Sequence, residues 1–91
     1  MNANTPGPWR VGIDPAVVWQ ENGAETMIAV LKEGADVERE ANARLIAAAP
    51  DLVSSLRLAL NTLGAKGGPS AAERDMAMAS ARIALRKAGQ L

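Results

Sequence analysis

The stretch Ala41–Leu52, which reads ANARLIAAAPDL, decides the fold more than any other part of the chain. Apolar residues recur in it three and four positions apart, which predicts a helix with one apolar stripe. The stripe starts before this stretch and resumes in register beyond the proline, at Val37, Ala41, Leu45, Ala48, Leu52, Leu56, Ala59, Leu60 and Leu63. Proline has no N–H to donate inside a helix. The helix therefore either kinks at Pro50 or stops near Ala48 and restarts with Pro50 in its first turn. We favour the restart, with the direction nearly maintained.

Polar residues mark the ends of the helical part. Asp36 is the expected cap of the first helix, and Gly64 is expected to end the segment that contains Pro50. Residues 65–69 form the next loop. Ser70 and Glu73 have the spacing of a capping box, which opens a last helix that ends near Gly89.

The residues before Asp36 predict strands. Residues 1–8 form an arm that contains two prolines, and apolar residues then alternate with others from Trp9 to Ile13. Two further short strands are expected at Val17–Gln20 and Thr26–Leu31, with turns at Asp14-Pro15 and Asn22-Gly23. The prediction is one α+β domain over residues 1–91. A three-stranded antiparallel meander (9–33) packs against two or three C-terminal helices (36–88).

Composition excludes most enzyme chemistry. The chain has neither cysteine nor histidine, so it lacks the usual thiolate nucleophile, the usual general base and the commonest zinc ligands. We therefore expect no enzyme, no metal site and no cofactor. The sequence shows neither a signal peptide nor a membrane span, which predicts a cytoplasmic protein.

The expected core is thin for 91 residues. Alanine accounts for 19 of them, and Trp9 and Trp19 are the only aromatic residues. Alanine buries little surface, so we expect both tryptophans in the core and a homo-oligomer that supplies further burial. Asn42 lies within the predicted apolar arc, where a buried amide would need hydrogen-bond partners.

The last helix is apolar on two sides. Met76 and Ile83 fall on one side, and Met78 and Leu85 fall nearly opposite. One side is expected to face the rest of the domain and the other a second subunit or a target.

Charge is divided between the two parts of the chain. Residues 1–56 carry four basic and eight acidic residues, and residues 57–91 carry six basic and two acidic ones. The glycine-rich loop at Gly64–Ser70 lacks the P-loop pattern, and a plain connector is the favoured interpretation. The candidate ligand or partner residues are Lys66, Arg74, Met78, Arg82, Leu85 and Arg86.

Two motifs carry a family resemblance. TPGPWRV (Thr5–Val11), followed by NARLIAAAPDL (Asn42–Leu52), resembles a family of short proteins of tailed phages and prophages, over roughly residues 5–60. The family often has a histidine before TPGPW, where this chain has Asn4. The resemblance implies a phage accessory protein made in the host cytoplasm, and it supplies no catalytic or binding residue.

Three functions follow as hypotheses. The first is a non-enzymatic protein that binds and neutralises a host component, above all a defence protein. The second is an oligomeric sponge that sequesters an anionic nucleotide signal with Lys66, Arg74, Arg82 or Arg86. The third is a small DNA-binding regulator that uses the positive C-terminal part, whose binding would weaken with salt.

Overall fold

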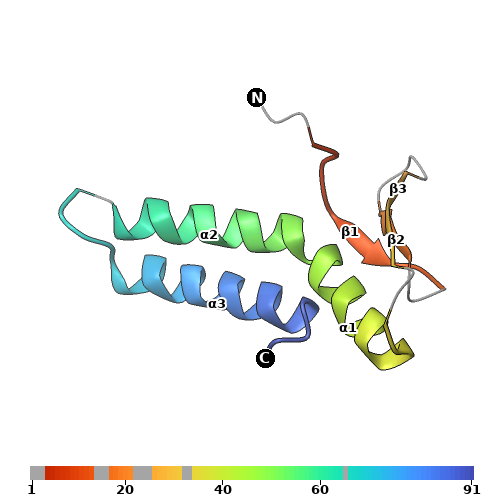
Figure 1. The fold of residues 1–91 in the computed structure, drawn as a ribbon. Helices are drawn as coiled ribbons and strands as arrows, with labels where there is room; N and C mark the ends of the chain where they lie inside the picture. Colours follow the sequence, from red (N-terminus) through yellow and green to blue (C-terminus); the bar gives the residue numbers. More distant parts are fainter. Residues whose placement is uncertain (1–3, 14–16, 22–25, 32–33, 65) are drawn as a thin grey trace.

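A three-stranded antiparallel sheet precedes three helices in this computed structural model (Figure 1). The strands are β1 (Trp9–Val11), β2 (Val17–Gln20) and β3 (Met27–Val30), in the order β1-β2-β3. The predicted α+β meander is thus confirmed. The structure describes residues 4–13, 17–21, 26–31, 34–64 and 66–91. The turns predicted at Asp14-Pro15 and Asn22-Gly23 lie outside these residues.

The sheet register places the largest strand residues on two faces. Val11 pairs with Val18, and Val18 pairs with Ala29, so these three share the face that packs on α1. Trp9 also packs against this cluster, which confirms its predicted place in the core. Trp19 pairs with Arg10 and lies on the opposite face, over Gly12, where an added Cβ would be 2.8 Å from the indole. The predicted core position of Trp19 is therefore wrong, because this face of the sheet does not pack on α1.

The helices are α1 (Asp36–Ala47), α2 (Ala49–Leu63) and α3 (Ala71–Lys87). Ala48 separates α1 from α2, with Pro50 in the first turn of α2, so the predicted restart is confirmed. The prediction of a maintained direction is wrong, because α1 is inclined to α2 in Figure 1. Asp36 does not cap α1. The cap position is Ala35, and Asp36 instead pairs with Arg39 in the first turn.

The buried face of α1 differs from the predicted stripe. Ala43 and Ala47 are buried against Val18, whereas Val37 is 81% exposed. Alanines face the sheet because their small side chains let α1 approach the bulk of Trp9 and Val18 closely. Asn42 is exposed, so the predicted buried amide is also wrong.

Small residues join α2 to α3. The side chains buried between and beside these helices are those of Ala48, Ser55, Thr62, Ala84 and Ala88. Their spacing of seven residues along α2 and four along α3 keeps a narrow strip of each helix against the other. The two helices therefore form a hairpin, and most of their large apolar residues lie beside the contact rather than in it.

The ends of α3 match their predicted signals. Ser70 and Glu73 make both hydrogen bonds of a capping box. At the other end Gly89, with φ of 74°, follows the cap residue Ala88. The N–H groups of Gly89 and Gln90 donate to the carbonyls of Arg86 and Leu85, which is the Schellman arrangement. Within the described residues, none of these helices is long and apolar enough to cross a membrane.

Candidate functional site

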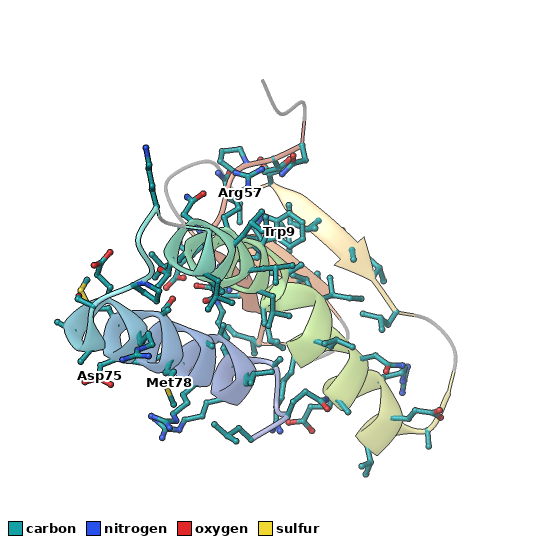
Figure 2. All side chains as sticks on the ribbon, turned by 90° about the vertical axis from the view of Figure 1, so that its left-hand side faces the viewer. Trp9, Arg57, Asp75 and Met78 are labelled. Atoms are coloured by element: carbon teal, nitrogen blue, oxygen red, sulfur yellow. The ribbon has the colours of Figure 1, made fainter. Side chains whose placement is uncertain are left out.

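The N-terminal arm and the start of α2 enclose a groove, which we call the arm groove. Its volume is about 380 Å³, and it lies on the side of α2 that faces away from α3. Figure 2 labels Trp9 and Arg57, which line this groove, and Asp75 and Met78 on α3. The groove is lined by Asn4, Pro6, Gly7 and Trp9 from the arm and β1, and by Ala49, Pro50, Val53, Ser54 and Arg57 from α2.

Gly7 and Pro50 are in direct contact in the lining of the arm groove. A Cβ added to Gly7 would lie 2.4 Å from the Cβ of Pro50, which is far inside van der Waals contact. Only glycine lets the arm approach α2 this closely. The TPGPW and NARLIAAAPDL motifs, more than 30 residues apart in the sequence, therefore meet at this point.

The arm groove combines an indole with a cation. Trp9 has its ring packed on the core cluster, and its buried Nε1 has no hydrogen-bond partner among the described residues. Arg57 is exposed and takes part in none of the ion pairs found in that part of the chain, which join Asp36 to Arg39, Glu40 to Arg44 and Asp51 to Lys87. This pairing can hold a flat or apolar group against the indole and an anionic group at the guanidinium.

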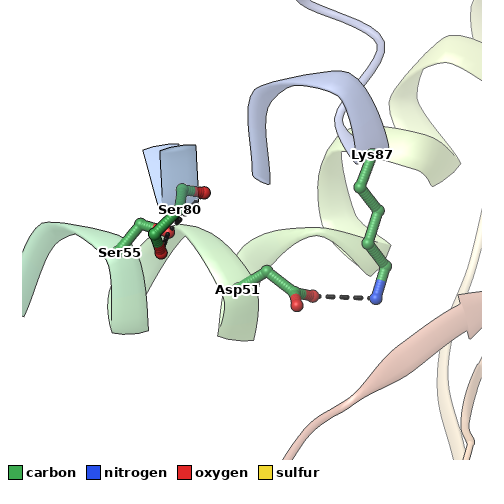
Figure 3. A network of polar contacts seen from close by, with 4 residues as sticks. All are labelled: Asp51, Ser55, Ser80 and Lys87. Carbon is green, nitrogen blue, oxygen red and sulfur yellow. Dashed lines mark hydrogen bonds and ion pairs between the residues drawn. The ribbon is translucent and has the colours of Figure 1, made fainter. Parts of the chain in front are cut away.

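A polar network fixes the register of α2 on α3 (Figure 3). The Ser55 Oγ donates to the Ser80 carbonyl at 3.1 Å and lies 2.9 Å from the Ser80 Oγ. One turn away, the Lys87 Nζ donates to the Asp51 carboxylate at 2.8 Å. The serine bonds give the buried hydroxyls hydrogen-bond partners within the contact between α2 and α3. The ion pair joins Asp51, in the acidic part of the chain, to Lys87, in the basic part.

Two apolar flanks border the contact between α2 and α3. The leucine flank consists of Leu56, Leu60 and Leu63 on α2 with Met78 and Leu85 on α3, by their helical spacing. The opposite flank consists of Leu58, Met76 and Ile83. Met76 and Ile83 are 66% and 63% exposed, so neither predicted side of the last helix is buried against the domain. The contact with α2 uses the alanines and Ser80 instead.

The six residues predicted as ligand or partner contacts do not gather at one point. Arg74 and Met78 line a hollow of about 280 Å³ on the leucine flank, between α2 and α3. Leu85 belongs to the same flank, while Arg82 and Arg86 are exposed one turn apart on α3. Lys66 is exposed in the loop, where Gly67 and Gly68 have positive φ and open surroundings. This geometry fits the predicted plain connector.

One carboxyl group has a perturbed pKa. The backbone N–H and the hydroxyl of Ser70 hold the pKa of Glu73 below its ordinary value of 4.5. Ser70 and Glu73 are the two residues of the capping box, so the shift reflects the start of α3 rather than catalysis. Among the described residues, no three acidic side chains come together as metal ligands.

Sequence reasoning missed the arm groove. Arg57, Gly7 and Pro50 were not predicted to be site residues, because the groove depends on the path of the arm across α2. The available signal was the pairing of the two family motifs, since motifs shared in order along a chain are candidates for contact in space.

Comparison with protein families gives a match that spans both motifs. Searches of curated proteins and of solved structures found no match. A family model described as Salmonella phage P22 protein Y8K6 matches residues 1–90, and therefore also covers the last helix, which the motif resemblance left out. The chain belongs to this family of phage proteins.

Proposed function

We propose that the protein is a non-enzymatic phage accessory protein that binds and neutralises a component of the bacterial host, with defence proteins as the target class. The observation that carries the proposal is the arm groove, where the two family motifs meet through Gly7 and Pro50. Membership of a phage family supports the setting. The absence of histidine and cysteine supports binding rather than catalysis.

The chemistry of the arm groove suits a protein partner. Tryptophan and arginine are the residue types that most often dominate binding energy at protein interfaces. Trp9 is fixed by the core beneath it, so its ring is held in place before a partner arrives. The guanidinium of Arg57 is free to pair with an acidic side chain of the target.

Affinity purification from the bacterial host tests this proposal. We expect the tagged wild-type protein to recover one host protein, and Arg57→Ala to lose it. Arg86→Ala is the matched control, because Arg86 is exposed on α3 and does not line the arm groove. Loss of one charged interface contact of this kind costs about 1–4 kcal/mol of binding free energy. In parallel, deletion of the gene should lower phage plating on hosts that carry the corresponding defence.

Two results would count against the proposal. One is recovery of no host protein together with unchanged plating on defended hosts. The other is loss of the partner in Arg86→Ala but not in Arg57→Ala, which would move binding from the arm groove to α3.

The nucleotide sponge is the second candidate, and the arm groove again favours it. A volume of about 380 Å³ falls within the range of small-molecule sites, and an indole beside a guanidinium suits a base with its phosphate. Of the four cations predicted for this role, only Arg74 lines the hollow between α2 and α3. A nucleotide panel tests the sponge, since a bound ligand raises the unfolding temperature according to RT ln(1 + [L]/Kd). No rise with any nucleotide would exclude it.

A further inference from the structure

We propose that the leucine flank is the interface of a homodimer, in which two α2–α3 hairpins stack face to face as a four-helix layer. The proposal starts from how little the single chain buries. The fully buried side chains of the core are alanines and Val18, and Val18 is the largest of them. By contrast, Leu56, Leu60 and Leu63 are each more than 70% exposed.

The surface of the chain exceeds that of a compact monomer. It exposes 6465 Å² at a mass of 9.5 kDa. A compact protein of that mass exposes about 5,000 Å², which is about 1,400 Å² less. The radius of gyration is 15.3 Å, against about 12 Å for a compact chain of this length. The excess matches the area of about 1,000–2,500 Å² that each subunit of an obligate homodimer buries.

The shape of the leucine flank suits a two-fold contact. A hollow of about 280 Å³ lies at Ala59, Ala77 and Ala81, with Leu63 and Met78 at its edge. A side chain that protrudes from one copy can enter the hollow of the other, and symmetry repeats the contact in reverse. Small residues beside large ones are what such interlocking needs.

A second copy fits this flank better than a foreign partner does. Because the single chain buries little apolar surface, it needs the further burial that this flank can supply, and the cover must then be present whenever the chain is folded. A second copy meets this condition, because it is synthesised with the first. The leucine flank also carries large aliphatic side chains with a single charged residue, Arg74, beside its hollow, as is typical of permanent homodimer interfaces.

Two methionines provide a matched test. Met78 lies on the leucine flank and Met76 on the opposite flank, two residues away, and they are 51% and 66% exposed. We expect the wild type to have twice the chain mass in light scattering. Met78→Glu should weaken dimerisation at least about 100-fold, because it places a carboxylate in an apolar contact, and pairing with Arg74 of the same hollow offsets only part of the cost of burying that charge. Met76→Glu should leave the dimer intact.

The thermal unfolding midpoint of the wild type provides a second test, which does not depend on whether Met78→Glu folds. The wild-type midpoint must rise with protein concentration when folding is coupled to dimerisation. A wild-type monomer with a concentration-independent midpoint would overturn the proposal. A dimer that Met76→Glu splits and Met78→Glu does not would overturn it as well. Neither result depends on a host target, so the proposed function is tested separately.

Discussion

At the scale of single residues, Gly7 is the described glycine at which an added Cβ would meet the closest contact. A Cβ there would lie 2.4 Å from the Pro50 Cβ, which belongs to a ring that cannot rotate away. Either the arm must leave α2 or α2 must shift. The arm groove therefore depends on this glycine for its shape.

We predict that Gly7→Ala destabilises the protein by about 1–3 kcal/mol, the usual range for overpacking. Urea unfolding measures the free energy, and the emission of Trp9 in a Trp19→Phe background reports whether the arm has moved. Asn4→Ala is the control, since it trims the same arm without adding volume. An unchanged free energy and unchanged Trp9 emission in Gly7→Ala would show that the arm does not pack on Pro50.

The residue scale also shows where sequence reasoning fails. The core position of Trp9 was predictable because large aromatic side chains are scarce in this chain. The prediction that Asn42 is buried was wrong, because an apolar arc drawn from Val37 and Leu45 places the wrong face of α1 on the sheet. In the alanine-rich helix α1, the buried face is the one that comes closest to the sheet, at Ala43 and Ala47. The large side chains of the helix lie beside that face.

At the scale of elements, local signals were reliable. Pro50 predicted the break between α1 and α2, and Ser70 with Glu73 predicted the start of α3. These signals depend on backbone hydrogen bonding within one turn, so the sequence contains all of their partners. The inclination of α1 to α2 was not predictable, since it depends on how α1 packs on a sheet far away in the sequence.

The capping box at the start of α3 predicts that the stability of the protein depends on pH. The folded pKa of Glu73 is lowered, so the stabilisation by its ionised carboxylate is complete above the ordinary value of 4.5 and is lost as pH falls through the lower folded value. The stability difference between wild type and Glu73→Gln should therefore vanish in acid. Urea unfolding from neutral to acidic pH measures it. If the stability difference between wild type and Glu73→Gln were the same at every pH, the charge of Glu73 would not be its cause.

At the scale of the whole molecule, the excess exposed surface is the dominant feature. The thin core was predictable from 19 alanines among 91 residues, and so was the need for further burial. The position of the apolar surface was not, because the sequence assigned one side of the last helix to the domain. In the structure both sides of α3 border a contact made by small residues, and the leucine flank extends across α2 as well.

This arrangement separates two tasks on one small chain. In the proposed dimer the leucine flank, through Leu63 and Met78, is the surface for a second copy, and the arm groove lies on the side of α2 away from α3. A dimer built in this way carries two arm grooves, each with its own Trp9 and Arg57. Two copies of a binding site increase the apparent affinity for a target that is itself oligomeric.

Native mass spectrometry of the protein, purified gently from infected host cells, tests the central claim most directly. We predict a species that contains two chains together with a host protein, and the loss of that host protein in Arg57→Ala. Bare chains from the wild type, with no bound host protein, would contradict it.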